Sequence, residues 1–533
     1  MNTVQRVGMV AVLFVLVFTL FGYKSIKERL SSHGIQSGSI GNRKSTLQEG
    51  TTVLKGDYQC NKYSFTPSRG EVYQTGIDLP TNTIMNTCLL ENVCLTTSGE
   101  FVLFHRKEHF PTPQSFSDWN GKPWVYAQGK VTSSKRGNFN LNLEDADLVV
   151  RSGKDKIEGV SLRRKTTCNS NDCEKFETIP AKIHDQFTII SEPVYAFYRF
   201  AVGNVGHIFL ENINNVMNLM MNYNPSLLNS EQIFDNRILF LDDVYDITGD
   251  SWMGSYKYNL NQSSRLSIEV ASLFSNRETL QVCNKENEVT IEKAPCKNVP
   301  FSKPSERVLQ TCFSKFHIGT SSDLLAYYQN GRESVFVHMK NLIYQKLKLP
   351  QPANNDERRE YLKTKDIRIT IHKKSLSDRH GSVIYNADEL LSHLTEMLPT
   401  NPDIKQLMQD RQLIVEFINL YNMSVPDQIR YYSTVDVYIT DGGSASYYSL
   451  FMTEGSSVLS APSCNPGCVR GFTNILETWP HIRVKNIVDL APTTCITRFS
   501  TVNQQNCDPV LQKEAVLSYV LSSLKYRYQL ISE

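Results

Sequence analysis

The sequence predicts an α/β protein with at least two domains, and three observations support this prediction. The chain has 533 residues, which is more than one hydrophobic core usually holds. Strand-like and helix-like segments alternate regularly from residue 366 onward, as in a parallel sheet covered by helices. Within this region, the run from Asp436 to Phe451 is typical of a strand, a Gly-Gly turn and a helix start.

The first residues are predicted to anchor the chain in a membrane. Residues 7–23 are apolar and uncharged, and their number lies at the short end of what spans a bilayer. The run ends in Thr19-Leu-Phe-Gly-Tyr-Lys24, a poor cleavage site, which favours an uncleaved signal anchor over a cleaved signal peptide. Residues 1–6 would then be a cytoplasmic tail, and residues 24–57, rich in Ser, Gly, Thr and Gln, would be a stalk.

The cysteines indicate an oxidising compartment. There are 12, all beyond the apolar run. Close pairs expected as disulfides are Cys88/Cys94, Cys168/Cys173, Cys283/Cys296, Cys464/Cys468 and Cys495/Cys507. No metal site is expected, because the spacing of zinc ligands is missing. The cysteines therefore favour a luminal position for the residues after the apolar run. They outweigh the Lys and Arg residues that follow this run, which alone would favour the opposite membrane orientation.

Two further features concern glycosylation and the class of partner. Asn261 and Asn422 each begin an Asn-x-Ser triplet, which permits N-glycosylation. Lys and Arg number 56 against 54 Asp and Glu, a net charge of +2. This balance argues against a nucleic-acid binder, which would be clearly basic.

Residues 58–348 are expected to form an N-terminal lobe with a mixed pattern. Strand-like segments such as 101–104 and 237–241 alternate there with helical ones. The clearest helix is expected over residues 205–223. Its apolar stripe consists of Ile208, Ile213, Val216, Met217 and Met220. Residues 349–365, rich in Pro, Asn and charge, are predicted to connect this lobe to the next.

Residues 366–533 are expected to form a Rossmann-like lobe. Strands are predicted at 366–371, 413–418, 435–440 and 457–460, and helices at 386–397, 424–434 and 446–452. Asn386 is expected to cap the first helix, and Ser424 with Asp427 forms a capping-box start for the second. Strands separated by helices predict right-handed crossovers and a parallel sheet.

The Gly442-Gly443 turn is the principal candidate binding site. Its backbone N–H groups and the helix start that follows suit an anion such as a nucleotide diphosphate, and glycine lets phosphates approach without a Cβ in the way. Lys373, Lys374 and Arg379 follow the first strand of the lobe at the same edge and could neutralise a diphosphate. An ordinary tight turn beside a solvated basic loop is the alternative.

A second candidate site begins at Gly203-Asn-Val-Gly-His207. His207 and Glu211 lie four residues apart at the start of the long helix and so share a face. A carboxylate near an imidazole can tune a general base. The alternative is that the histidine is half-buried with its hydrogen bonds formed inside the protein, that the glutamate is solvated, and that neither has a catalytic role. We expect this run to face the Gly442-Gly443 turn across a cleft between the lobes.

Two other motifs are weaker. Gly442-Gly-Ser-Ala-Ser446 nearly matches the nucleophile elbow of hydrolases, with Ser444 as nucleophile. Its last glycine is replaced by serine, and His481 precedes the acid Asp489, which reverses the usual order. Asp145-Ala-Asp147 matches a short metal-and-nucleotide pattern, but it lies in a polar stretch before the regular lobe and is interpreted as chance.

Taken in order, five segments resemble the family-61 glycosyltransferases, which include plant β1,2-xylosyltransferase, the EGF-domain O-GlcNAc transferase and the protein O-mannose β1,4-N-acetylglucosaminyltransferase. They are Cys88-Leu-Leu-Glu-Asn-Val-Cys94; Gly203-Asn-Val-Gly-His207; Cys312-Phe313 with Gly319; Lys373-Lys374, Arg379, Asn386 and Glu389-Leu390; and Met423-Ser424, Asp427-Gln-Ile429, Asp436-Val437, Gly442 and Leu450-Phe-Met452. Their order and spacing, rather than any single motif, carry the resemblance.

The resemblance implies a GT-B-like fold, with two Rossmann-like lobes that bind the acceptor (N-terminal lobe) and the donor (C-terminal lobe) across a cleft. It implies a type II membrane enzyme of the Golgi or endoplasmic reticulum that moves a sugar, GlcNAc or xylose above others, from a UDP-sugar to a hydroxyl of a glycan or glycoprotein. Inversion at the sugar carbon, and no need for a metal or other cofactor, would follow. His207, Glu211 and Asp441 would be candidates for the base, and Lys373, Lys374, Arg379, Gly442, Gly443 and Ser444 would bind the diphosphate.

The chain departs from the family pattern at the donor site. Asp441 stands where the family has a histidine, and Lys373 and Lys374 stand where it has two arginines, so bidentate phosphate contacts are lost. A luminal relative without catalysis, or a glycan-binding module, is therefore the second hypothesis.

Overall fold

The computed structural model describes residues 50–65, 83–104, 141–154, 156–166, 175–197, 204–241, 260–285, 288–296, 306–321, 334–374, 383–408, 411–420, 423–464, 467–470, 476–477, 479–499 and 505–532. Apart from residues 152–156, the described residues belong to one compact unit. The expected anchor at residues 7–23 and most of the stalk lie outside them. Within the described ranges, no helix is both long and apolar enough to cross a membrane.

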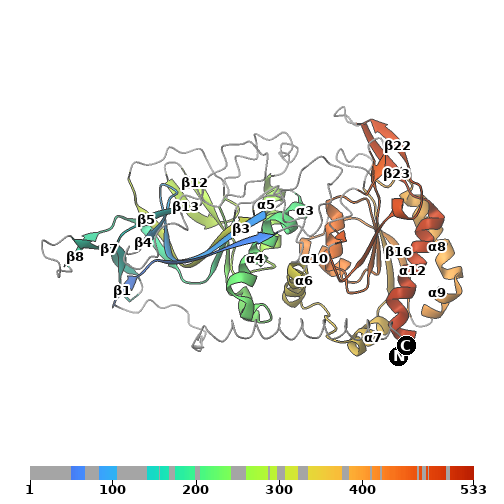
Figure 1. Ribbon diagram of the computed structural model, residues 1–533, viewed down its shortest axis with the longest axis horizontal. Helices are drawn as coiled ribbons and strands as arrows, with labels where there is room; N and C mark the ends of the chain where they lie inside the picture. The colour runs from blue at the N-terminus through green and yellow to red at the C-terminus, as the bar shows by residue number, and fades with distance from the viewer. Residues whose placement is uncertain are drawn as a thin grey trace, which may run out of the picture. The chain divides into compact units, whose positions relative to one another are not determined.

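The N-terminal half is built on a ten-stranded mixed sheet (Figure 1), with the main order β13-β12-β11-β10-β14-β3-β4-β5. Its strands are β2 (Asp57–Phe65), β3 (Thr83–Thr96), β4 (Phe101–Phe104), β5 (Leu141–Glu144), β9 (Ile183–Ile190), β10 (Val194–Phe197), β11 (Arg237–Phe240), β12 (Leu280–Lys285), β13 (Glu288–Lys293) and β14 (Leu309–Ser321). The expected strands at 101–104 and 237–241 are confirmed as β4 and β11. β12, β11, β10 and β14 run parallel, whereas β14 and β3 are antiparallel. This lobe is therefore mixed rather than wholly Rossmann-like.

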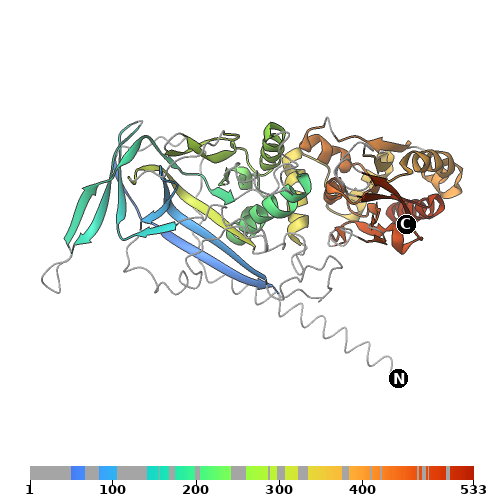
Figure 2. The same cartoon turned by 90° about the horizontal axis from the view of Figure 1, so that it is seen from above.

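A second, four-stranded sheet has the order β1-β6-β7-β8. It consists of β1 (Gly50–Leu54), β6 (Asp147–Ser152), β7 (Ile157–Thr166) and β8 (Lys175–Pro180). β7 and β8 form an antiparallel hairpin, drawn in teal in Figure 2. Asp147 of β6 is buried and pairs with Arg163 at 3.2 Å. The Asp145-Ala-Asp147 pattern thus has one of its two carboxylates engaged in the structural core.

The predicted helix at residues 205–223 is present but not uniform. It consists of α3 (Val205–His207), a π-helical segment η2 (Ile208–Ile213) and α4 (Asn214–Tyr223). All five residues of the expected apolar stripe are buried. Asn204 caps the helix, because its side chain accepts a hydrogen bond from the Gly206 N–H at 3.0 Å. A π-helical turn is rare and is frequently found at functional sites.

The remaining helical segments of this half lie around the sheet and in the expected connector. They are η3 (Pro225–Leu227), η4 (Glu231–Phe234), α5 (Leu260–Ala271), α6 (Ser334–Leu347) and α7 (Asn355–Thr364). α7 falls within the expected connector at 349–365. It begins at Asn354, whose side chain accepts from the Glu357 N–H at 2.9 Å.

The C-terminal half contains the parallel sheet that the sequence predicts. Its five strands run parallel in the order β16-β15-β17-β18-β21. They are β15 (Ile367–His372), β16 (Leu413–Ile418), β17 (Val437–Thr440), β18 (Ser457–Ser460) and β21 (Arg483–Asn486). The helical segments are α8 (Ala387–Met397), η7 (Leu398–Thr400), α9 (Pro402–Leu407), α10 (Val425–Tyr432), η8 (Ser444–Phe451), η9 (Ile487–Asp489) and α12 (Lys513–Ser532).

Helices cover both faces of this parallel sheet. Val437 and Ile439 of β17 pack with residues of α8 and α12, whereas Tyr438 between them packs with residues of α10 and η8 (Figure 1). This alternation is expected for a buried strand. The α10 side shares its hydrophobic core with Phe209 and other residues of the N-terminal half. The segment expected as a helix at 446–452 is instead the 3₁₀ segment η8.

The two expected helix caps have different outcomes. The Ser424 side chain accepts from the Asp427 N–H at 3.3 Å and donates to the Asp427 carboxylate at 2.6 Å, which confirms this cap. Asn386 precedes α8 without a capping bond from its side chain. Its side chain instead pairs with the backbone of Leu511, through bonds of 2.8 and 2.9 Å, and so ties the chain before α8 to the segment before α12.

Four disulfides are described, and they confirm three of the five expected close pairs. The bonds are Cys94–Cys312, Cys283–Cys296, Cys464–Cys468 and Cys495–Cys507. The expected pair Cys88/Cys94 is wrong, because Cys94 of β3 lies directly opposite Cys312 of β14 and bonds to it. Cys88 is disulfide-bonded as well. Cys168 and Cys173 lie outside the described residues.

A buried ion cluster joins the start of β17 to the last helix. Asp436 is fully buried, and its carboxylate contacts the Lys365 ammonium at 2.7 Å and the Arg527 guanidinium of α12. The backbone N–H of Arg368 adds a hydrogen bond of 2.8 Å. Burial alone would raise the pKa of Asp436, but Lys365 and Arg527 more than offset this and hold the pKa below its usual value.

His317 of β14 makes the stability of the fold depend on pH. Its ring stacks on Tyr195 at 4.5 Å, and burial lowers the pKa of His317 from 6.5 to about 4. Because the unfolded chain takes up this proton first, stability should be lost as pH falls from 6.5 toward 4, by about 1.4 kcal/mol per pH unit.

Urea unfolding at several pH values between neutral and mildly acidic would measure this slope. The His317→Gln variant should have a shallower slope than the wild type over the same range, because glutamine does not take up a proton. Equal slopes for both proteins would show that His317 does not titrate as its burial implies.

Candidate functional site

The Gly442-Gly443 turn follows β17 at the carboxyl edge of the parallel sheet. Gly442 has a φ of +74°, which disfavours other residues there. A Cβ at Gly443 would lie 2.6 Å from the Lys374 Nζ, so glycine lets this ammonium approach the turn. η8 begins directly afterwards at Ser444. Its first N–H groups have no partner within the helix and are suited to an anion.

Asp441 is the buried centre of the site. Its carboxylate contacts the His372 Nδ1 at 3.2 Å and the Lys374 Nζ at 2.7 Å, and it accepts from the Gly443 N–H at 3.0 Å. Burial alone would raise the pKa of Asp441, but His372 and Lys374 outweigh it and hold the pKa well below its usual range. Asp441 is therefore a poor general base and a strong anchor for the Lys374 ammonium and the His372 ring.

The two neighbouring lysines have different partners. The Lys374 Nζ lies at the turn, where it pairs with Asp441, and the Lys374 side chain is 19% exposed. The Lys373 Nζ instead contacts both carboxylate oxygens of Asp388, at 2.6 and 2.8 Å, and lies 4.7 Å from the centre of the Phe417 ring. Of the two lysines predicted to bind the diphosphate, only Lys374 is at the turn. Arg379, the third predicted cation, lies outside the described residues.

His372 is part of the site although the sequence argument did not select it. It is the last residue of β15, and its side chain is 9% exposed. The available signal was its position, because a polar residue at the carboxyl end of a parallel strand lies on the edge where ligands bind.

The run that begins at Gly203 lies against the turn region at one point. Gly206 of α3 packs so closely on η8 that a Cβ there would lie 2.4 Å from the Tyr447 ring. Phe209 of η2 contacts Phe451 with ring centres 5.1 Å apart. The two runs are therefore neighbours, but at this point a packed contact joins them, where the sequence predicted a cleft. The positions of the His207 and Glu211 side chains lie outside what is described, so their role as bases stays a prediction.

The hydrolase alternative lacks its catalytic triad. The ring of His481 donates from Nε2 to the Leu450 carbonyl at 2.9 Å, and Asp489 pairs with Arg470 at 3.0 Å. His481 and Asp489 are therefore each committed to another partner instead of to each other and Ser444. The glycosylation prediction stays untested, since Asn422 lies outside the described residues and only the backbone of Asn261, in α5, is described.

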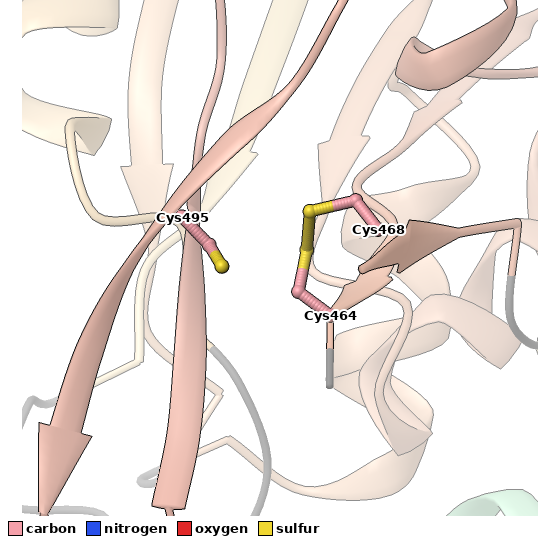
Figure 3. A group of neighbouring side chains, drawn as sticks. All are labelled: Cys464, Cys468 and Cys495. Carbon is pink, nitrogen blue, oxygen red and sulfur yellow. A yellow bond between two sulfur atoms is a disulfide. The ribbon is translucent and has the colours of Figure 1, made fainter. Parts of the chain in front are cut away.

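Three cysteine sulfurs gather beside the C-terminal sheet (Figure 3). The Sγ atoms of Cys464, Cys468 and Cys495 lie within 4.8 Å of one another. They belong to a small sheet of β19 (Ser463–Cys464), β20 (Cys468–Val469), β22 (Thr494–Phe499) and β23 (Gln505–Val510). Cys464 bonds to Cys468, and Cys495 bonds to Cys507. While both disulfides are intact, no thiolate is available here as a metal ligand.

This cysteine sheet adjoins the loops around the candidate site. Ala461, three residues before Cys464, donates its N–H to the Thr440 carbonyl at 2.7 Å, directly before Asp441. On the other side, the Asp508 carboxylate accepts from the Val383 N–H at 3.1 Å, in the segment that leads to α8. The Asp508 bond therefore links the sheet that carries the two disulfides to the segment that leads into α8.

Comparison with known proteins identifies one family. The family model described as Glycosyltransferase 61 matches residues 205–459. The matched region begins at α3 and ends in β18, so it contains both candidate runs. No curated protein sequence matches the chain.

Solved structures give weak similarity. E. coli heptosyltransferase WaaC with ADP aligns at 8% identity and a TM-score of 0.23, over 64% of this chain and 99% of that one. WaaC with ADP-2-deoxy-2-fluoro heptose aligns at 8% identity and a TM-score of 0.19, over 63% and 99%. Scores this low carry no argument about the arrangement of the two halves.

Proposed function

We propose that this chain, whose residues 205–459 match the family-61 glycosyltransferases, transfers a sugar from a UDP-sugar to a hydroxyl group of a glycan or glycoprotein. One observation carries the choice of donor. Lys374, His372 and Asp441 form a largely buried polar cluster, which includes an ammonium, beside the Gly442-Gly443 turn. A diphosphate is the part of a sugar nucleotide that such a cluster would recognise.

Positive charge and backbone amides would hold the diphosphate. Lys374 supplies a fixed ammonium, and the N–H groups at the start of η8 face the same turn. We assign Lys374, Gly442, Gly443 and Ser444 to this role and leave Lys373 out, because Asp388 holds it elsewhere. Lys374 would stabilise the charge of the departing diphosphate, a task that other transferases give to a metal ion, so we propose a metal-independent reaction.

The acceptor would be activated from the N-terminal half. We propose that His207 or Glu211, on the helix that contains the π-helical segment η2, removes the proton of the acceptor hydroxyl. The acceptor oxygen then attacks the sugar carbon as the bond to the diphosphate breaks on the opposite side, which inverts this carbon. Asp441 is not assigned as a base, since its carboxylate is held by the Lys374 ammonium and the His372 ring.

The four disulfides among the described residues support placement in an oxidising compartment. Together with the apolar run at residues 7–23, they favour a type II membrane protein of the Golgi or endoplasmic reticulum, with the transferase luminal. GlcNAc and xylose are the sugars that the resemblance favours. A relative that binds sugar nucleotides or glycans without turnover is the second candidate, because Asp441 and the lysines depart from the family pattern.

Thermal unfolding with a panel of sugar nucleotides tests this function. A donor that binds the native state must raise the melting temperature by mass action. We expect one UDP-sugar, UDP-GlcNAc or UDP-xylose, to raise it, with the same shift in EDTA and with slow release of UDP. Cooperative melting without a shift from any donor would favour the non-catalytic relative. A shift that EDTA abolishes would contradict metal independence.

A further inference from the structure

His372 has an arrangement that its position in a strand does not require. A backbone carbonyl would be enough to pair with the ring of a histidine at the end of a buried strand. The His372 ring instead points its Nδ1 at the Asp441 carboxylate, 3.2 Å away. Asp441 itself is held by Lys374 and by the Gly443 N–H. The imidazole is thus held by a carboxylate that two further contacts keep in place.

This contact determines which ring nitrogen is available to a ligand. An ionised carboxylate only accepts hydrogen bonds, so the His372 Nδ1 must carry a hydrogen. The Nε2 atom is then the one that can meet a ligand, as in other carboxylate–histidine pairs. Among the residues that the structure describes, none bonds to this Nε2. Nine-tenths of the His372 side chain is buried, but its Nε2 is not among the fully buried polar atoms without a partner, so this atom is open to solvent or to a ligand.

The neighbours of this atom indicate the chemistry of that ligand. The Lys374 Nζ and the Gly443 N–H both contact the carboxylate that holds the His372 ring. An ammonium and the N–H groups at the start of η8 suit a phosphate. A phosphate oxygen only accepts hydrogen bonds, so an Nε2 that meets it must be the donor.

We propose that His372 is a catalytic residue whose Nε2–H donates a hydrogen bond to the β-phosphate of the donor, and that Asp441 is the positioning residue that orients the ring. The proposal rests on the proposed donor site. As the bond between the sugar carbon and the β-phosphate oxygen breaks, its electron pair stays on that oxygen. The acceptor proton goes to the base on the N-terminal helix, and His372 keeps its own proton. Charge on the oxygen grows, so the hydrogen bond is strongest in the transition state.

The resulting test compares His372→Ala with His372→Gln, measuring UDP affinity by calorimetry and steady-state kinetics with the donor. For His372→Ala we expect kcat to fall by about 100-fold or more, and KM for the donor to rise by less than about 10-fold. Glutamine keeps an N–H near the position of Nε2 without the charge, so His372→Gln should recover part of the lost kcat. His184→Ala, at a histidine of β9 that faces Glu288, is the matched control and should keep wild-type values.

A double-mutant cycle tests the role of Asp441. Asp441→Asn should lower kcat about as much as His372→Ala, and the double variant should lose little more, because the two residues act as one unit. A merely structural role for Asp441 would instead lower the melting temperature and leave the kcat of the folded fraction unchanged.

The outcomes separate this proposal from the proposed function. Unchanged UDP affinity and kcat in folded His372→Ala would overturn the role of His372 and leave the transferase intact. A wild-type protein that binds UDP through His372 but transfers no sugar would overturn the transferase and keep the phosphate contact. A wild-type protein that binds no UDP would overturn both.

Discussion

The Lys374→Met variant should lose about 100-fold or more in kcat/KM for the sugar donor, because an ammonium within about 4 Å of a phosphate at a protein surface contributes several kcal/mol. The loss has two sources. The substitution removes a cation from the phosphate site. It also leaves Asp441, which lies 2.7 Å from the Lys374 Nζ, as a poorly compensated negative charge beside the phosphates. Methionine keeps most of the side-chain volume, so the turn should retain its packing.

The neighbouring lysine provides the control for this prediction. Lys373 has the same chemistry and is one residue away, but Asp388 and the Phe417 ring hold it away from the turn. Lys373→Met should therefore change kcat/KM by less than about 3-fold. Equal losses in the two variants would show that charge near the strand end matters in general, and would remove the specific role given to Lys374. Steady-state kinetics at fixed ionic strength measures both.

Asp436→Asn should lower the free energy of unfolding by about 3–5 kcal/mol, because removing one partner of a buried ion pair leaves charge without compensation. Asparagine keeps the shape of the side chain, but it cannot balance the Lys365 ammonium and the Arg527 guanidinium. Asp436 and Arg527 are 0% and 1% exposed, so water cannot replace the missing charge. Burial already lowers the pKa of Lys365 to about 8, so this lysine would give up its proton more readily in the variant.

Urea unfolding at neutral pH measures this loss. Asp235→Asn is the matched control, because Asp235 pairs with Arg277 at 2.7 Å but is 64% exposed. It should cost less than about 1 kcal/mol. A similar cost for the two substitutions would mean that the Asp436 cluster is better hydrated than its burial indicates.

Much of the C-terminal half could be predicted from sequence because its signals are local. Apolar strands between helical segments define the parallel sheet, and all four expected strands are present as β15, β16, β17 and β18. The glycines at 442 and 443 mark a turn that needs left-handed backbone and close approach. Such features depend on a few adjacent residues, so a single sequence is enough to find them.

The N-terminal half was harder to predict because its contacts are distant in sequence. Cys94 has a closer cysteine at 88, and nothing in the local pattern favours Cys312, which is 218 residues away. The pairing follows from the register of β3 with β14, and that register depends on the whole sheet.

Within the site, sequence reasoning found the turn but not the partners of each side chain. Lys373 and Lys374 are equivalent in composition and differ only in the direction of their side chains. The role of His372 depends on its contact with Asp441, 69 residues later in the chain. Neither property can be read from residue type or spacing alone.

The bond between Cys94 and Cys312 has a consequence for how the protein is made. At about 5–20 residues per second, the ribosome needs tens of seconds to add the 218 residues between the two cysteines. During this time Cys94 is a thiol without its partner, and Cys88 is only six residues away in the chain. The nascent protein must therefore delay oxidation at Cys94, or depend on a disulfide isomerase to correct an early pairing. The yield of folded protein should accordingly be sensitive to the disulfide-isomerase capacity of the producing cell.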